Sequence, residues 1–133
     1  MQITAFFPVI LFRDLETGLK EYEAMGFERK HTTENFAMKS YVLELNGNRV
    51  EIFTSQMEVF DLPDGYYGMR INVRDFEEGV EFFGTKGYRL FMGPFENEYS
   101  RVGILTDEEG RKIFLYKHFR KEEREARAAQ QQA

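Results

Sequence analysis

The stretch MRINVRDFEEGVEFFGTKGYR, residues 69–89, decides the fold because the chain contains this pattern twice. Sixty-one residues earlier the chain reads PVILFRDLETGLKEYEAMGFE, residues 8–28, and the two stretches align without a gap. Both copies place an apolar residue before Arg-Asp and place glycines at matching positions, among them Gly18 with Gly79 and Gly26 with Gly87. Two copies are too few for a solenoid, so we interpret them as a duplicated module whose halves pack as one domain.

The composition is that of a globular protein of about one domain. Hydrophobic residues make up 42% and aromatic residues 16% of the 133 residues, which argues against a disordered chain. The chain has no cysteine, so it has neither disulfides nor a thiolate nucleophile, and a cytoplasmic location is the default expectation. A net charge of −5 argues against binding to nucleic acid and would suit a cationic small molecule.

The opening apolar run of the chain is too short to span a bilayer, and it lacks a basic leader, so we expect no membrane partner.

Several catalytic classes can also be set aside. The sequence contains no Gly-rich phosphate loop after a strand, no HExxH motif, and no set of residues for a Ser-His-Asp or Cys-His centre, since it has two histidines and no cysteine.

Each copy of the pattern predicts a strand, a helix and three further strands. An apolar run is followed by Asp14, a residue that favours a helix start, and apolar residues then recur at helical spacing until Gly26. The first module, residues 1–54, is therefore βαβββ, with strands at 3–12, 27–33, 36–45 and 49–54 and a hairpin turn at 46–48. The second module, residues 67–118, repeats this order with a helix at 75–84 and strands at 67–73, 89–91, 99–106 and 112–118.

Three segments lie outside this regular pattern. Residues 92–98 contain Gly93 and Pro94, which predicts a loop. Residues 55–66 break both periodicities and form a linker, within which we expect four apolar residues to pack, namely Met57, Val59, Phe60 and Leu62. Residues 119–133 are charged and then rich in Ala and Gln, which predicts a solvated helix or a frayed tail after a domain that spans residues 1–118.

Alternation along the strands assigns residues to the two faces of the sheet. Ile71 and Val73 are apolar and should lie under the helix with Met69, so the residues between them face the other way. The same alternation places Val50 and Ile52 under the first helix, and it places Ile113 and Leu115 of the last strand on the inner side as well. The opposite face then carries a mixture of rings, charges and amides: Phe7, Glu51, Phe53, Gly68, Arg70, Asn72, Phe114 and Tyr116.

Two βαβββ modules, each with an Asp that opens a helix closed by Gly-Phe or Gly-Tyr, together with the final DEEGRKIFLY at residues 107–116, resemble the vicinal oxygen chelate superfamily. This superfamily includes glyoxalase I, extradiol dioxygenases and bleomycin-resistance proteins. The resemblance covers residues 3–118 and implies an α+β fold in which two βαβββ modules form a single glyoxalase-like domain with a cupped mixed sheet. It also implies a homodimer, because the cups of this family are commonly completed or packed across a two-fold axis.

In metal-dependent members of the superfamily, four side chains from the first and last strands of each module hold a divalent ion. The internal repeat carries these positions onto Phe7 and Glu51 in the first module, and onto Gly68 and Phe114 in the second. One carboxylate is too few protein ligands for a catalytic divalent ion. We therefore expect no metal and no cofactor, and this expectation favours a binding protein over an enzyme without deciding between them.

The roles of the individual side chains stay open at this point. Glu51 is a partner of Arg70 or a polar ligand anchor, an acid or base, or a residue without a role. The rings fill the cup or form an aromatic wall for a ligand. Tyr41, Tyr99 and Arg101 would reach the cup if their strand alternation places them there, and His31 and His118 are interpreted as surface residues.

The predicted function is metal-independent binding of a small organic molecule, similar to the bleomycin-resistance branch, in which an acidic protein sequesters a cationic or aromatic compound and so confers antibiotic resistance. Two alternatives remain. One is a lyase, isomerase or dioxygenase of the same superfamily that recruits a metal through other residues. The other is a degenerate interaction module whose cup is filled by its own rings.

Overall fold

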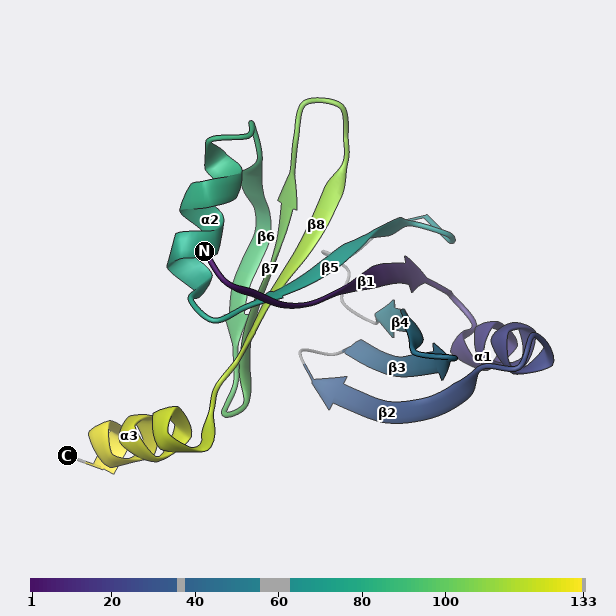
Figure 1. Ribbon diagram of the computed structural model, residues 1–133, viewed down its shortest axis with the longest axis horizontal. Helices are drawn as coiled ribbons and strands as arrows, with labels where there is room; N and C mark the ends of the chain where they lie inside the picture. Colours follow the sequence, from purple (N-terminus) through teal and green to yellow (C-terminus); the bar gives the residue numbers. More distant parts are fainter. Residues whose placement is uncertain (36–37, 56–62, 133) are drawn as a thin grey trace. The chain divides into compact units, whose positions relative to one another are not determined.

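A computed structural model describes residues 1–35, 38–55 and 63–132 of the chain (Figure 1). The chain forms two compact units, which we call the first unit (Phe7–Met69) and the second unit (Met1–Phe6 with Arg70–Ala133). The first module contains β1 (Ile3–Leu11), α1 (Leu15–Ala24), β2 (Glu28–Asn35), β3 (Met38–Leu45) and β4 (Asn48–Ser55). The second contains β5 (Tyr67–Val73), α2 (Phe76–Gly84), β6 (Arg89–Glu96), β7 (Ser100–Thr106) and β8 (Lys112–His118), followed by α3 (Lys121–Gln132). The predicted α+β class and the two βαβββ modules are confirmed.

The repeated aspartates begin the two helices, as the sequence predicts. Asp14 Oδ1 accepts a hydrogen bond from the Thr17 amide at 3.3 Å, and Asp75 Oδ1 accepts one from the Glu78 amide at 3.0 Å. Each carboxylate thereby satisfies one of the backbone N–H groups that a helix leaves without a partner in its first turn. The repeated Arg-Asp pair therefore immediately precedes the first helix residue in both modules.

In the first unit, the strands take the order β2-β3-β4-β1, with β1 parallel to β4 and the other pairs antiparallel. Leu15 and Leu19 of α1 pack in one buried cluster with Val50 and Ile52 of β4. The prediction that Val50 and Ile52 lie under the helix is confirmed. Since side chains alternate along a strand, Glu51 and Phe53 point to the opposite face.

In the second unit, the strands take the order β5-β8-β7-β6, and β8, β7 and β6 are antiparallel neighbours. Gly79 of α2 faces the side chains of Leu115 and Val73, which lie where its missing Cβ would make contacts of 3.2 to 3.4 Å. Glycine thus lets α2 lie close to β5 and β8. The prediction that Val73 and Leu115 pack under the helix is confirmed.

The predicted loop at residues 92–98 is wrong, because β6 continues through Gly93 and Pro94 to Glu96. β6 is the last strand in the order of the second unit, and its register against β7 shifts on both sides of Met92. A proline lacks an amide hydrogen, but an edge strand does not need that donor on its outer side, and bulges absorb the irregular residues.

The last segment is a helix, α3, and it buries none of its residues. The sequence predicted a solvated helix or a frayed tail at residues 119–133, and α3 is a helix over residues 121–132. The predicted packing of the linker residues Met57, Val59, Phe60 and Leu62 lies outside the described residues, as does the start of the strand predicted at 36–45.

None of the helices in the described ranges is long and apolar enough to cross a membrane.

Candidate functional site

The predicted site residues that lie in the second unit gather around Arg70. The Nε atom of Arg70 donates a hydrogen bond to Asn72 Oδ1 at 2.9 Å, two residues further along β5. The guanidinium carbon of Arg70 lies 3.8 Å from the centroid of the Tyr116 ring, a cation–π arrangement. Arg70 is only 7% exposed and Asn72 8% exposed. A charge this buried requires polar or aromatic neighbours, and these residues supply them.

His118 also contacts this group, from an exposed position at the end of β8 that agrees with the predicted surface location. Its Nε2 atom lies 2.8 Å from a terminal nitrogen of Arg70, and its ring lies 6.2 Å from that of Tyr116. A guanidinium only donates hydrogen bonds, so Nε2 is the acceptor in this contact. Strand alternation could have found this residue, because His118 follows Tyr116 by two positions and so faces the same side. His31, by contrast, is exposed on β2 as expected.

Apolar side chains surround this polar group on the same face of the second unit. In the β7–β8 register, Val102 lies opposite Tyr116 and Ile104 lies opposite Phe114. Val102, Ile104 and Phe114 are all 5% exposed or less. The face therefore combines an apolar floor with one guanidinium, one amide and one imidazole, which is the usual chemistry of a small-molecule site.

In the first unit, three predicted site residues share one face of β1 and β4. Glu51 lies opposite Val9 and Phe53 lies opposite Leu11 in the parallel register, and Phe7 precedes Val9 by two residues. Phe7, Glu51 and Phe53 are all at most 5% exposed. The fourth predicted residue of this unit, Gly68, is buried on β5. The predicted pairing of Glu51 with Arg70 stays a prediction.

Three further candidates lie elsewhere, which closes an alternative that the sequence left open. Tyr41 belongs to the buried cluster under α1, where its hydroxyl lies 2.5 Å from Glu16 Oε1. Arg101 lies over the ring of Phe76, the first residue of α2, and pairs with Glu77 at 2.7 Å. Tyr99 precedes β7 and is 57% exposed. None of the three therefore shares the face that carries the Arg70 group.

The residues at the family's metal positions do not fit a divalent ion. Phe7, Gly68 and Phe114 offer no side-chain donor, and Glu51 offers one carboxylate. Within residues 1–35, 38–55 and 63–132, no group of three or more His, Asp or Glu side chains is placed to hold a metal. No catalytic step through such an ion can be assigned to these positions.

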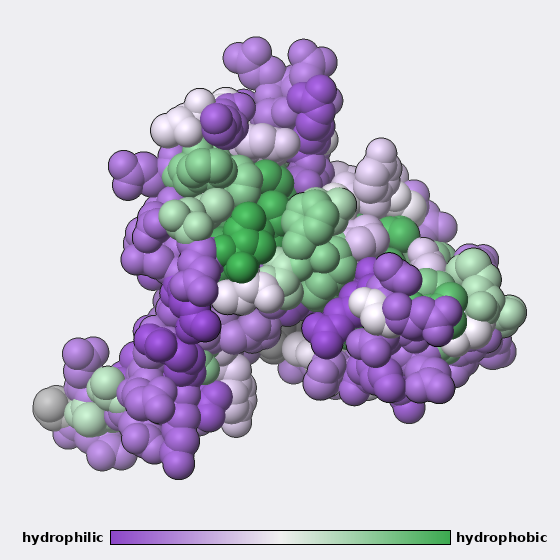
Figure 2. Space-filling model, in the orientation of Figure 1, coloured by the Kyte–Doolittle hydropathy of each residue, from purple (hydrophilic) through white to green (hydrophobic). Residues whose placement is uncertain are grey.

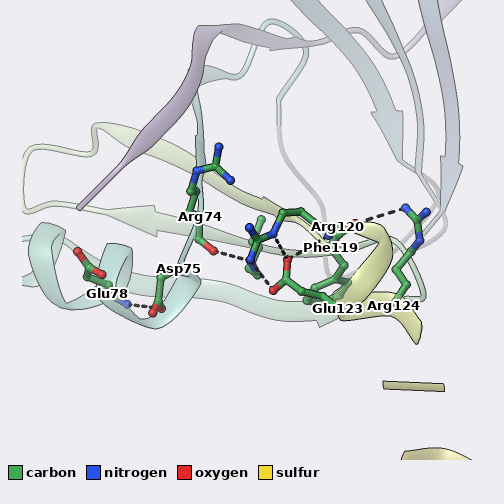
Figure 3. Close-up of polar contacts among 8 residues, drawn as sticks. Arg74, Asp75, Glu78, Phe119, Arg120, Glu123 and Arg124 are labelled. Carbon is green, nitrogen blue, oxygen red and sulfur yellow. Dashed lines mark hydrogen bonds and ion pairs between the residues drawn. The ribbon is translucent and has the colours of Figure 1, made fainter. Parts of the chain in front are cut away.

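In the second unit, another network of ion pairs and hydrogen bonds attaches α3 to β8 (Figure 3). Lys117 Nζ donates to the Arg74 carbonyl and pairs with Glu123 at 2.9 Å. Glu123 also accepts hydrogen bonds from the Arg120 backbone amide at 3.0 Å and from Arg120 Nε at 3.1 Å. The hydrogen bond from the Arg120 amide, assisted by Lys117, lowers the pKa of Glu123 to about 2.

Comparison with known proteins gives structural matches alone: no protein-family model and no curated protein matches the chain. Methylmalonyl-CoA epimerase from Mycobacterium tuberculosis is similar in structure, with a TM-score of 0.67 and 18% identity over 90% of this chain and 91% of that protein. A hypothetical protein from Bacillus halodurans C-125 has a TM-score of 0.68 and 13% identity over 91% and 98% of the two chains.

A glyoxalase/bleomycin resistance protein/dioxygenase superfamily member from Vibrio splendidus 12B01 has a TM-score of 0.56 and 16% identity over 87% of this chain and 99% of that one. Identities this low establish a shared fold and leave the function to be argued from the residues. These matches agree with the two βαβββ modules and with the resemblance found in the sequence. The chain therefore has the vicinal oxygen chelate fold, the fold of the glyoxalase/bleomycin resistance/dioxygenase superfamily.

Proposed function

We propose that this protein binds a small organic molecule without a catalytic metal ion, in the manner of the bleomycin-resistance branch of the fold. The observation that carries the proposal is the contact of two buried residues, Arg70 and Asn72, with the half-buried ring of Tyr116 on an otherwise apolar face. A few fixed polar groups among apolar side chains orient a ligand while the apolar area supplies most of the binding free energy.

The proposed ligand is an aromatic or cationic compound. In the second module, the rings of Phe114 and Tyr116 would stack on it, and Arg70 and Asn72 would orient its polar groups. The roles that the sequence suggests for four residues of the first unit stay predictions: further rings from Phe7 and Phe53, a carboxylate for a cationic group from Glu51, and close approach of the backbone at Gly68. A cytoplasmic location is part of this proposal, and the lack of cysteine fits it.

Native mass spectrometry of the full chain purified from cells tests the proposal. The expected result is a bound organic compound that survives gentle desalting and is lost on denaturation. Tyr116→Ala should lose it, because the stacking surface and the cation–π partner of Arg70 are removed. Phe82→Ala is the matched control, since Phe82 is an exposed ring on α2, and it should retain the compound. Equal retention by both variants would show that the ligand does not use the Tyr116 face.

A metal-dependent lyase, isomerase or dioxygenase is the second candidate, and the structural likeness to methylmalonyl-CoA epimerase favours it. In that case the metal would be held by residues other than those at the family's positions. Elemental analysis of the purified protein separates the two candidates. Stoichiometric Ni, Zn, Mn or Fe that resists dialysis would contradict metal-independent binding, whereas a trace amount would contradict the enzyme.

A further inference from the structure

A groove in the second unit lies apart from the Arg70 group. Its cavity volume is about 510 Å³, which is within the range that holds small molecules. One wall comes from α3 and the other from the connection between β6 and β7. The lining residues are Glu96, Asn97 and Glu98 on one side, and Arg124, Arg127, Ala128 and Gln131 on the other.

Ionic and aromatic contacts hold the two walls together. Arg127 of α3 forms an ion pair with Glu96 of β6, and its guanidinium carbon lies 4.1 Å from the centroid of the Phe119 ring. Glu96 also pairs with Arg101 of β7 at 3.7 Å. The charges of Glu96 and Arg127 are therefore already matched, and the two residues fix the position of α3 against the β6–β7 connection.

Two other charges in the groove are not matched in this way. Arg124 donates to the Phe119 carbonyl at 3.3 Å (Figure 3). Its guanidinium carbon lies 5.6 Å from the centroid of the Tyr99 ring. Among the residues that the structure describes, no carboxylate lies within ion-pair distance of Arg124, and no cationic group lies within ion-pair distance of Glu98. The α3 wall thus offers a guanidinium and the facing wall offers a carboxylate.

Asn97 adds an oriented donor to the same groove. Its Oδ1 atom accepts hydrogen bonds from the amides of Tyr99 and Ser100, both at 2.8 Å, and from Ser100 Oγ at 3.4 Å. An atom that accepts three hydrogen bonds must be the amide oxygen, so the other end of the side-chain amide is the nitrogen. In the part of the chain that the structure describes, no acceptor lies at that nitrogen, so its two N–H groups can donate to a ligand in the groove.

We propose that this groove binds a small zwitterion, such as a free amino acid, with its carboxylate at Arg124 and Asn97 and its ammonium group at Glu98. A purely anionic ligand would be repelled by the carboxylate of Glu98, and a purely cationic ligand would be repelled by the guanidinium of Arg124. A ligand with both charges compensates both walls. The exposed ring of Tyr99 beside Arg124 provides an apolar surface for a side chain.

Two-dimensional NMR of the ¹⁵N-labelled full chain tests the proposal with glycine, L-glutamine and L-phenylalanine as probes. At least one probe should cause saturable shifts of the Asn97 side-chain amide below about 10 mM. Its N-acetyl derivative and its carboxamide each lose one charge, and each should bind roughly tenfold more weakly. Absence of saturable shifts with all three probes, or equal binding of a probe and its single-charge derivatives, would overturn the proposal.

Paired variants locate the two charges. Arg124→Gln and Glu98→Gln should each weaken binding of the same probe by roughly tenfold, because each removes one of the two compensating charges. Arg89→Gln and Glu81→Gln change exposed charges outside the groove and should leave binding unchanged. The amide spectrum of each variant verifies its fold. Unchanged affinity in Arg124→Gln or Glu98→Gln would show that these two side chains do not recognise the ligand.

Discussion

At the residue scale, the two equivalent helix glycines, Gly18 and Gly79, face different surroundings. A Cβ at Gly18 would lie 2.7 to 2.9 Å from the ring of Phe12, whereas a Cβ at Gly79 would lie 3.2 Å from the flexible side chain of Leu115. Alanine gains about 1 kcal/mol over glycine inside a helix, and overpacking costs about 1–3 kcal/mol. Urea denaturation should therefore show Gly18→Ala destabilised by about 1–2 kcal/mol and Gly79→Ala close to the wild type.

Gly84, the last residue of α2, provides the control for this pair. A Cβ there would meet nothing within 4 Å, so Gly84→Ala should leave the free energy of unfolding unchanged or raise it by roughly 0.5 kcal/mol. A Gly18→Ala variant as stable as Gly84→Ala would show that the Phe12 ring moves aside without cost. In that event the close approach of α1 to Phe12 would not be what requires glycine at position 18.

His118 allows a second prediction at this scale, because its Nε2 atom accepts a hydrogen bond from Arg70. His118→Gln keeps an acceptor oxygen and should unfold at nearly the same urea concentration as the wild type. His118→Lys places a second positive charge beside the guanidinium and should lower the free energy of unfolding by about 1–2 kcal/mol. Lys121→Gln, an exposed change on α3, controls for the loss or gain of a remote charge. Equal stability of the Gln and Lys variants would contradict the acceptor role.

At the element scale, the attachment of α3 should depend on pH through Glu123. The pKa of this carboxyl is about 2, below its ordinary value of 4.5, so ionised Glu123 stabilises the folded state. This contribution is complete above pH 4.5 and is lost as the pH falls from 4.5 through 2. Amide shifts of residues 121–132 should therefore move towards those of an unattached helix over this range.

Variants on the first turn of α3 separate Glu123 from the other acids of the helix. Glu123→Gln should show the low-pH amide shifts already at pH 7, since it loses the charge that holds Lys117 and Arg120. Glu122→Gln, an exposed neighbour on the same turn, should keep the wild-type pH response. If Glu123→Gln retained the wild-type shifts at neutral pH, α3 would be held by Arg124 and Arg127 instead.

At the same scale, β6 shows why the loop predicted at residues 92–98 was wrong. Gly93 and Pro94 are unfavourable inside a strand, so local propensity predicts a loop. Pairing with β7 on one side overrides that propensity, because the register shifts at Met92 place the irregular residues where no ladder bond is required. Strand propensity depends on the residue type alone, whereas a position at the edge of a sheet depends on the order of the strands.

At the scale of the whole molecule, the homodimer that the family resemblance implies stays a prediction, and exposed apolar residues of the second unit favour it. Figure 2 shows apolar surface over α2 and the start of β1, and in this unit Ile3 is 47%, Phe6 62% and Phe82 41% exposed. Apolar patches on a protein surface commonly mark interfaces. Sedimentation velocity should show a dimer for the wild type and a monomer for Phe6→Ser, whereas Tyr67→Ser, which changes an exposed ring of the first unit, should remain a dimer.

The internal repeat determined most of the fold without help from the structure. Strand alternation, the capping aspartates and the glycines after each helix are local signals, because each depends on residues a few positions apart. They predicted the order of both modules, the helix starts at Asp14 and Asp75, and the packing of Val50, Ile52, Val73 and Leu115 under the helices. Within the described residues and apart from β6, the strands and helices they predicted differ from the observed ones only near the ends, where cooperative pairing decides the boundary.

The tertiary structure decided which side chains meet. His118 contacts Arg70 across forty-eight positions of sequence, Tyr41 and Arg101 pack on the helix sides of their units, and α3 meets the β6–β7 connection at a charged groove. Alternation along a strand assigns a face, but it does not assign a neighbour, because a neighbour depends on strand order and register. The sequence alone therefore determined the modules and the sides of their sheets, and only the packing of distant strands determined the contacts from which a function can be argued.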